Sequence, residues 1–276
     1  MKNICIVTGG GSGMGLEAAK LVGKDQKIIL AGRTVSKLEN AIAELTALGI
    51  EAEAFPADVS DRASVERLAE YAQKQGVVKS VINAAGVSPR MTDGKKIFAI
   101  NGAGPIHMTE VFAPIMGQGS CILHVASMSA YMVPDDRTPT QLFELALQGV
   151  DAFLAGAEHM LDGMPPETQA GIAYSVSKKF VIWYTARMAV KYGASGVRIV
   201  SISPGTFSTP MGNLEGETAA AFALQGALGR VGEPVEIAHM MAFMVSDACS
   251  YLSGVDILYD GGSIAALRAK ADEQKH

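Results

Sequence analysis

Tyr174 and Lys178 are the two side chains in this sequence best suited to move a proton. Four residues apart, they lie one helical turn from each other and share a helix face. A tyrosine hydroxyl ordinarily has a pKa of about 10 and is a weak base at neutral pH. A neighbouring ammonium group favours the phenolate and lowers that pKa. The pair is therefore suited to protonate a carbonyl oxygen or to remove an alcohol proton, unless it is an ordinary exposed helix pair.

A glycine-rich turn near the start of the chain is suited to bind a dinucleotide. It follows the apolar run 4–7 and precedes the helical pattern 16–22, the order that a dinucleotide fingerprint requires. Glycines let the backbone approach a pyrophosphate, and a helix N-terminus favours negative charge. The turn is Thr8-Gly9-Gly10-Gly11-Ser12-Gly13-Met14-Gly15. Alone, such a turn can lack a ligand; together with the Tyr–Lys pair it predicts an enzyme that exchanges hydride with a nicotinamide cofactor.

The residues after the second expected strand favour NADP(H) as the cofactor, with NAD(H) as the alternative. Binding of NAD requires a carboxylate about 20 residues beyond the glycines, where it bonds the ribose hydroxyls. Here the sequence has Gly32-Arg33-Thr34 instead. The Arg33 guanidinium suits a 2′-phosphate, and Thr34 or Ser12 would add a hydrogen bond. The alternative for Arg33 is an ordinary solvated side chain.

Asp58 and Val59 follow the third expected strand. At the carboxyl edge of the sheet, the Asp58 carboxylate would accept a hydrogen bond from an adenine amino group. Alternatively, Asp58 or Ser60 caps the helix that follows. The sequence leaves both interpretations open.

Composition and charge argue against several classes of function. The chain has 276 residues, 49% of them hydrophobic, and a net charge of −5 with both signs interspersed. Without a basic stripe or a Lys/Arg-rich amphipathic segment, we expect no binding to nucleic acid or membranes. No apolar run approaches the ~18 residues of a membrane span. The scattered cysteines (Cys5, Cys121, Cys249) suggest buried free thiols rather than a metal site. With no signal-peptide pattern, we expect a cytoplasmic protein.

Apolar runs alternate with amphipathic helical stretches along the chain. This predicts an α/β fold with a single Rossmann-type, doubly wound parallel sheet of about seven strands flanked by helices. The expected strands are 4–8, 27–31, 51–56, 80–83, 121–126, 198–203 and 257–259. The expected helices include 35–48, 63–75, 174–192 and one beginning near Pro234, and Ser36 and Glu39 fit a capping box for the first. We expect one domain over residues 1–264 and a loose polar tail over 265–276.

Further motifs follow in a fixed order along the chain. They are Asn83-Ala84-Ala85-Gly86, Asn101, Ser127, Ser203-Pro204-Gly205 with Thr206 and Thr209, Arg230-Val231-Gly232-Glu233-Pro234, and Asp260-Gly261-Gly262. With the glycine turn and Tyr-x-x-x-Lys, this series resembles the short-chain dehydrogenase/reductase family over residues 4–262. Ala84 stands where the family usually has a second asparagine.

The resemblance implies a role for each of these residues. Tyr174 is then the general acid/base, and Ser127 orients the substrate oxygen. Lys178 also binds the nicotinamide ribose, and Asn101 helps hold a water that links the lysine to solvent. The expected cofactor-binding residues are Thr8, Gly9, Gly11, Ser12, Gly13, Met14, Gly15, Arg33, Thr34, Asp58, Val59, Asn83, Ala84, Ala85, Gly86, Tyr174, Lys178, Pro204, Gly205, Thr206 and Thr209. The alternative from another class is a cofactor-binding regulatory protein without turnover.

Ser127 and Tyr174 lie further apart than the family usually places them, which predicts a helical insertion at about 131–170. Two apolar-faced patterns, 140–148 and 151–161, would fill it. The insertion forms a lid or a pocket wall, or it has a structural or subunit-contact role. The enlarged segment resembles that of some hydroxysteroid dehydrogenase/carbonyl reductase members of the family.

The expected partner is a small-molecule alcohol or ketone. Five methionines near the cleft suit a bulky apolar substrate, such as a hydroxysteroid or another alicyclic compound, or simply fill the core: Met128, Met132, Met160, Met164 and Met211. A 3-oxoacyl thioester is a further alternative. Apolar helix surface predicts a homodimer or homotetramer, on the basis of Phe112, Phe180, Trp183 and Tyr184.

Overall fold

The predicted parallel sheet is present. The computed structural model describes residues 2–273, and its strands form one sheet with the order β3-β2-β1-β4-β5-β6-β7, all parallel. The strands are β1 Asn3–Thr8, β2 Lys27–Gly32, β3 Ala52–Pro56, β4 Val77–Asn83, β5 Ser120–Val125, β6 Val197–Pro204 and β7 Asp256–Tyr259. Each expected strand is found within a few residues of its predicted bounds, and the predicted fold class is confirmed.

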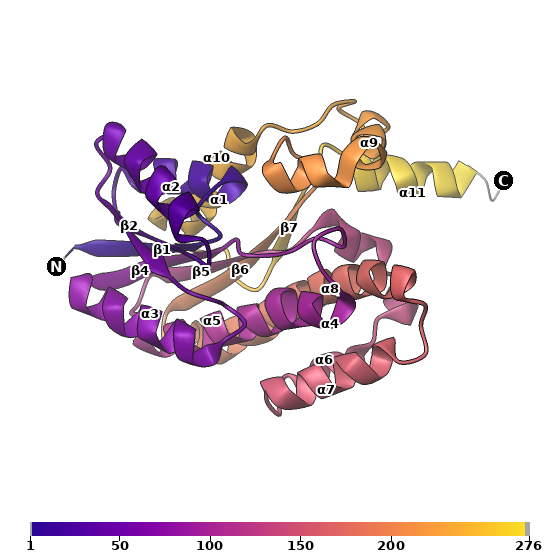
Figure 1. Cartoon of the computed structure of the whole chain (residues 1–276), viewed down its shortest axis with the longest axis horizontal. Helices are drawn as coiled ribbons and strands as arrows, with labels where there is room; N and C mark the ends of the chain where they lie inside the picture. The colour runs from indigo at the N-terminus through magenta and orange to yellow at the C-terminus, as the bar shows by residue number, and fades with distance from the viewer. Residues whose placement is uncertain (1, 274–276) are drawn as a thin grey trace.

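Helices cover both faces of the sheet, as Figure 1 shows. One face carries α1 (Gly13–Val22), α2 (Val35–Ala47) and α10 (Pro234–Val245); the other carries α3 (Arg62–Gln75), α5 (Gly104–Phe112) and α8 (Pro166–Gly193). The strands are apolar because both faces are buried. Along β1, Ile4 and Ile6 pack into one core, and Cys5 and Val7 pack into the other.

The winding of the chain reverses between β1 and β4. Strands β2 and β3 lie to one side of β1, and β4 to β7 lie to the other. The carboxyl ends of β1 and β4 therefore lie side by side, with Thr8 paired to Asn83. Such a switch point is where open α/β sheets bind ligands. It brings the glycine turn next to the segment that follows β4.

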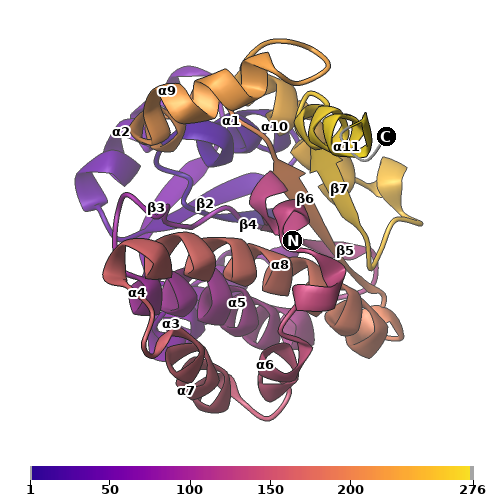
Figure 2. The ribbon, with the colours of Figure 1, turned by 90° about the vertical axis from the view of Figure 1, so that its right-hand side faces the viewer.

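The predicted insertion helices form an extra layer beneath α8 (Figure 2). They are α6 (Thr140–Leu145) and α7 (Val150–Leu161). Phe153 of α7 stacks on Phe180 of α8 with ring centroids 4.4 Å apart, and Phe143 of α6 contacts the same ring at 5.4 Å. The cavity around the candidate catalytic pair is lined by other segments. Helices α6 and α7 therefore form no wall of this cavity in the structure, and their packing on α8 agrees with the structural interpretation, while a subunit-contact role stays a prediction.

The same packing removes the apolar surface expected for a subunit contact. Phe112, Phe180 and Tyr184 are buried within the chain, and Trp183 is half-buried against Phe143. These aromatic side chains belong to the core because helices of the same chain cover them. The prediction of a dimer or tetramer therefore has no support from these residues.

One predicted helix start and one predicted capping box differ from the structure. Helix α8 begins at Pro166 rather than near Tyr174, because proline is well tolerated in the first turn of a helix. Helix α2 has Thr34 as its N-cap residue. The capping box of Ser36 and Glu39 is therefore wrong, since Ser36 already lies inside the first turn. The predicted start of α10 at Pro234 is confirmed.

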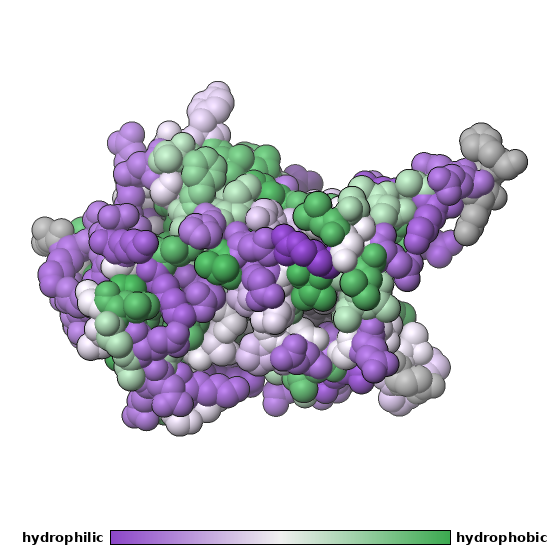
Figure 3. Space-filling view, turned by 90° about the horizontal axis from the view of Figure 1, so that it is seen from above, coloured by the Kyte–Doolittle hydropathy of each residue, from purple (hydrophilic) through white to green (hydrophobic). Residues whose placement is uncertain are grey.

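The expected loose tail is a helix as far as it is described. Helix α11 spans Ser263–Glu273, and residues 274–276 lie outside the described part. The Asp260 carboxylate accepts hydrogen bonds from the backbone of Gly262 and Ile264, and Ile264 is buried. The Ala, Leu, Arg and Lys residues that follow are strong helix formers. Figure 3 shows the mostly hydrophilic end of this helix projecting from the molecule.

Within residues 2–273, no helix has both the length and the apolar character needed to cross a membrane. The three cysteines are buried and free, as the sequence predicts.

Candidate active site

The glycine-rich turn connects β1 to α1 and packs against the segment that follows β4. Gly9 has a φ of +66°, and a Cβ there would lie 2.8 Å from backbone atoms of Ala84 and Ala85. Any side chain at this position would therefore clash. Ser12, the N-cap residue of α1, makes no side-chain cap hydrogen bond, so the N–H groups of the first turn are left for a ligand. The turn has the shape and polarity of a phosphate cradle.

A cavity of about 170 Å³ extends from this turn along the ends of β2 and β3. Nine of the predicted cofactor residues line it: Gly9, Gly11, Ser12, Arg33, Thr34, Asp58, Val59, Ala85 and Gly86. Lys37 of α2 lines it as well, although sequence reasoning missed this residue. Its position in the first turn of the helix that follows Arg33 and Thr34 is the signal that could have found it. Two cationic side chains thus border the part of the cavity next to α2.

Asp58 lies in the wall of this cavity and does not cap the next helix. Its Oδ1 atom accepts hydrogen bonds from the backbone N–H and the hydroxyl of Ser60, at 2.9 and 2.6 Å. Asp61 is the N-cap residue of α3, so a capping role for Asp58 or Ser60 is wrong. Burial raises the pKa of Asp58, but the hydrogen bonds from Ser60 and the charge of Arg33 outweigh it and lower the pKa. The side chain is therefore an ionised acceptor.

Ser127 and Tyr174 line a second cavity of about 210 Å³, which shares Gly86 and Val87 with the first. Ser127 lies two residues after the end of β5 and is the N-cap residue of a short 3₁₀ helix (Met128–Met132), and Tyr174 lies on α8. Burial raises the pKa of Tyr174, and the hydrogen bond with Ser127 partly offsets this. The two groups that the chemistry needs therefore share one cavity wall, and Ser127 is close enough to affect the pKa of Tyr174.

Lys178 is buried in the wall of the same cavity. Its Nζ atom donates a hydrogen bond to the Val125 carbonyl at 2.9 Å and lies 5.8 Å from the centre of the Tyr174 ring. Burial lowers the pKa of Lys178 to about 8. The prediction that Lys178 lowers the pKa of Tyr174 is wrong for this structure, because burial dominates and the pKa is raised.

Asn101 lies on a π-helical turn (Phe98–Ala103) and holds the segment after β4. Its Oδ1 atom accepts from the backbone N–H of Val87 and its Nδ2 atom donates to the Val87 carbonyl, both at 2.9 Å. A Cβ at Gly86 would lie 3.2 Å from Asn101 Oδ1 and 3.5 Å from Lys178 Nζ. The side-chain amide thus positions the segment between the two cavities.

A buried hydrogen-bond chain beneath the site orients four polar side chains. Thr8 donates to Asn83 Oδ1 at 2.7 Å, so the amide nitrogen of Asn83 faces Nδ1 of His124 at 3.2 Å and donates to it. Nε2 of His124 then carries the proton and donates to the Thr109 hydroxyl at 2.9 Å, which donates to the Pro105 carbonyl at 2.8 Å. Burial, helped by the charge of Lys178, lowers the pKa of His124 to about 3. The imidazole is therefore neutral, as the chain requires.

The remaining predicted residues divide between cavity wall and support. The second cavity is lined by Met14, Ala84, Gly86, Ser127, Tyr174, Lys178, Pro204, Gly205, Thr206 and Thr209. Five predicted residues lie outside both linings: Thr8, Gly13, Gly15, Asn83 and Asn101. Glu215 also lines the second cavity and was missed, because helix α9 (Pro210–Leu224) carries no motif. Met128 and Met211 line it too, whereas Met132 lies in a separate surface cavity.

Within the described residues, no group of three or more His, Cys, Asp or Glu side chains is arranged to hold a metal ion.

Comparison with known proteins agrees with this geometry. A family model described as short chain dehydrogenase matches residues 3–137, and one described as enoyl-(acyl carrier protein) reductase matches residues 162–263. The residues between the two matches hold α6 and α7.

Curated relatives match along nearly their whole length. A short-chain dehydrogenase/reductase, bsc3, of Alternaria brassicicola is 29% identical, with 97% of this chain and 98% of the relative covered. The meso-2,3-butanediol dehydrogenase of Serratia marcescens is 28% identical, with 95% of each covered. Among solved structures, a short chain dehydrogenase from Burkholderia cenocepacia in complex with NADP has a TM-score of 0.74 at 23% identity, with 94% of this chain and 96% of that one covered.

The chain belongs to the short-chain dehydrogenase/reductase family. It is an oxidoreductase that acts on alcohol or ketone substrates, in a family that uses NAD(P).

Proposed function

We propose that this enzyme interconverts a secondary alcohol and its ketone, with NADP(H) as the preferred cofactor and NAD(H) as the alternative. The observation that carries the proposal is that Ser127, Tyr174 and Lys178 line one cavity, which adjoins the cavity of the glycine turn at Gly86 and Val87. Bound in the first cavity, the nicotinamide cofactor would supply or accept the hydride. The chain itself supplies the proton transfer and the positioning.

Tyr174 acts at the substrate oxygen. In ketone reduction its hydroxyl donates a proton to the carbonyl oxygen, and in alcohol oxidation its phenolate form accepts the alcohol proton. Because burial raises its pKa, the hydroxyl is protonated at neutral pH, which suits donation. Ser127 orients the substrate oxygen. The ammonium of Lys178, with a pKa of about 8, is still mostly charged at neutral pH and stabilises negative charge that develops nearby.

The residues that would hold the cofactor follow from the first cavity. The glycine turn and the start of α1 suit the pyrophosphate, and the Asp58 carboxylate suits the adenine amino group. Arg33 and Lys37 suit a 2′-phosphate, since two cations border the cavity and Arg33 stands where NAD binding requires an acid. Lys178 suits the nicotinamide ribose, by resemblance to the family. These features support NADP(H).

Tyr174→Phe tests the catalytic proposal. We expect kcat/KM for ketone reduction to fall roughly 10²- to 10⁴-fold, since the proton donor is lost, while the Kd for NADPH stays within about threefold of wild type. The fully exposed Tyr251 provides a control, Tyr251→Phe, with wild-type kinetics. Unchanged turnover in Tyr174→Phe contradicts the mechanism. Binding of NADPH without turnover of any ketone by the wild type favours the cofactor-binding regulatory protein.

The cofactor preference is tested by the double variant Arg33→Ala, Lys37→Ala. We expect KM for NADPH to rise roughly 10- to 100-fold, because two charge-assisted contacts are removed, while kinetics with NADH change less than about threefold. Lys24→Ala is the matched control, since Lys24 is exposed and lines neither cavity. Equal losses with both cofactors would contradict a 2′-phosphate site.

The second cavity favours a substrate of modest size with apolar flanks. Its wall includes Val87, Val125, Met128, Phe207 and Met211. The substrate panel therefore pairs four-carbon and cyclohexyl ketones with a steroid ketone and a 3-oxoacyl thioester. We propose the alicyclic and short-chain ketones as substrates; higher kcat/KM for the steroid or the thioester would favour those alternatives.

A further inference from the structure

Glu215 is a carboxylate in the wall of the substrate cavity that the proposed reaction does not use. It lies on α9, and it lines the same cavity as Ser127 and Tyr174. Its Oε1 atom is shielded from solvent and has no hydrogen-bond partner among the described residues. A buried acceptor without a partner destabilises the protein, so such a group is informative about what binds beside it.

The backbone around Glu215 fixes where this side chain lies. Gly216 has a φ of +69° and a ψ of −155°, which interrupts α9 directly after Glu215. Thr209 caps the first half of the helix, with its hydroxyl accepting from the Gly212 N–H at 3.0 Å. The Thr206 hydroxyl donates to the Ala219 carbonyl at 3.1 Å and ties the second half to the end of β6. The carboxylate is thus held by a wall anchored on both sides of the break.

Glu215 is also close enough to affect the catalytic tyrosine. Its negative charge raises the pKa of Tyr174, after the larger effect of burial. A substrate group that donates a hydrogen bond to the Glu215 carboxylate would disperse this negative charge. The same hydrogen bond would give the shielded Oε1 atom its missing partner. An ammonium group would do so less well, because it would share the cavity with the Lys178 cation.

We propose that Glu215 is a specificity-determining residue that accepts a hydrogen bond from a second hydroxyl group beside the reacting carbon, so that the preferred substrates are vicinal diols and the matching hydroxyketones. This inference rests on the proposed alcohol oxidation and names its substrate class. The Ser127–Tyr174 pair takes the reacting oxygen, and Glu215 takes the neighbouring hydroxyl. A mono-alcohol of the same carbon skeleton leaves the carboxylate oxygen unpaired and binds more weakly.

The test compares 2,3-butanediol with 2-butanol, and 1,2-cyclohexanediol with cyclohexanol, with NADP⁺ at saturation. For the wild type we expect kcat/KM to be roughly 10- to 100-fold higher for each diol than for its mono-alcohol. Glu215→Ala should remove this preference, mainly by raising KM for the diol, and Glu215→Gln should give an intermediate ratio. Glu217→Ala is the matched control, because Glu217 is exposed on the same helix and lies outside the cavity.

A second measurement separates this inference from the catalytic proposal. Calorimetry with the NADP⁺-loaded Tyr174→Phe variant reports alcohol binding without turnover. Tighter binding of the diol than of the mono-alcohol, lost when Glu215→Ala is added, supports the inference. It does so even if the wild type turns over neither alcohol, because an absence of turnover would overturn only the catalytic proposal. Equal binding and equal turnover of diol and mono-alcohol by the wild type would overturn the role of Glu215. An equal loss for both substrates in Glu215→Ala would also overturn it, since Glu215 would then act on Tyr174 or on the cofactor.

Discussion

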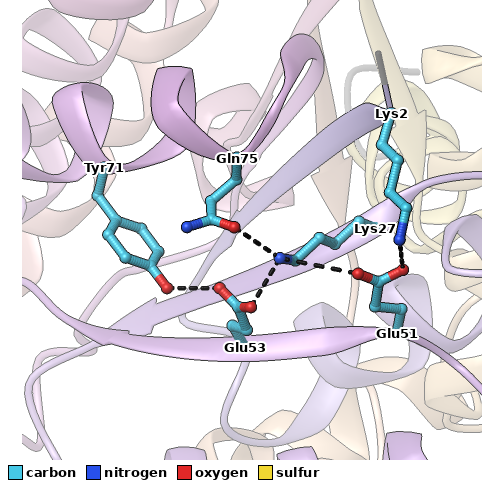
Figure 4. A network of polar contacts seen from close by, with 6 residues as sticks. All are labelled: Lys2, Lys27, Glu51, Glu53, Tyr71 and Gln75. Carbon is cyan, nitrogen blue, oxygen red and sulfur yellow. Dashed lines mark hydrogen bonds and ion pairs between the residues drawn. The ribbon is translucent and has the colours of Figure 1, made fainter.

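Two buried lysines lie at opposite edges of the sheet and differ in what surrounds them. Lys178, 6% exposed, lies at the carboxyl edge and donates to the Val125 carbonyl at 2.9 Å. Lys27, 8% exposed, lies at the amino edge and bonds Glu53 at 2.6 Å and Gln75 at 2.9 Å (Figure 4). The two side chains are buried to a similar extent, so the difference lies in the balance of charge.

The comparison separates a cation that is balanced by a carboxylate from one to which we assign a role in the proposed reaction. Glu53 balances Lys27, and Tyr71 donates a hydrogen bond to the same carboxylate, which holds β2, β3 and α3 together. Among the residues that the structure describes, Lys178 has a backbone carbonyl and no carboxylate as its partner, so burial lowers its pKa to about 8. A buried charge without a carboxylate partner destabilises the fold. Its presence in the substrate cavity is therefore explained by binding or chemistry rather than by stability.

Lys178→Met should produce the largest effect. We expect kcat/KM to fall roughly 10²- to 10⁴-fold, because the cation beside the reacting oxygen is lost. The free energy of unfolding should stay the same or rise, since a buried, uncompensated ammonium is replaced by an apolar side chain of similar length. Ketone reduction and urea unfolding measure the two quantities. A large loss of stability together with activity would contradict the distinction between the two lysines.

The pH dependence of stability should show the same asymmetry. The pKa of Lys178 is about 8 when folded and ordinarily 10.5, so between these values the unfolded chain binds more protons. The contribution of Lys178 to the free energy of unfolding therefore rises as pH increases from 8 to 10.5, and this gain is lost as pH falls back through 8. The wild-type free energy of unfolding minus that of Lys178→Met should increase by on the order of 3 kcal/mol from pH 8 to 10.5. A difference in the free energy of unfolding that does not change with pH would contradict the lowered pKa of Lys178.

The sequence predicts the sheet and the motif residues because both depend on short-range patterns. Apolar runs predict the strands, and the order of motifs predicts which residues meet at the switch point between β1 and β4. The structure places the predicted serine, tyrosine and lysine in one cavity. The insertion helices are also predicted, but not their position, since only tertiary packing shows that Phe143 and Phe153 cover α8.

Three site features depend on contacts between distant segments and could not be predicted in this way. His124 reads as one polar residue in an apolar strand, and its partners come from β4 and α5. Glu215 lies on a helix without a motif. The pKa of Tyr174 follows from burial, which spacing along a helix does not reveal.

Lys27→Met tests the structural lysine and should leave activity intact. We expect a loss of about 1–2 kcal/mol in the free energy of unfolding, because Glu53 and Gln75 lose their shared donor, while partial exposure lets water solvate the carboxylate. Urea unfolding measures this, and kcat should stay within about twofold of wild type. Lys24→Met is the control, since that exposed side chain lies near the same edge. A drop in kcat matching that of Lys178→Met would show that the two edges are coupled.

Lys2→Ala should have the smallest effect, although Lys2 joins the same network. Its Nζ atom lies 2.5 Å from Glu51, which also lies 3.8 Å from Lys27, but the Lys2 and Glu51 side chains are 62% and 51% exposed. Water solvates both charges, so the pair gains little over hydration, and salt screens what remains. We expect Tm to fall by less than about 2 °C in low salt, with no difference from wild type near roughly 1 M salt. A loss as large as that of Lys27→Met would mean that the network acts as one unit, and that burial of a single lysine does not decide which contacts stabilise the amino edge.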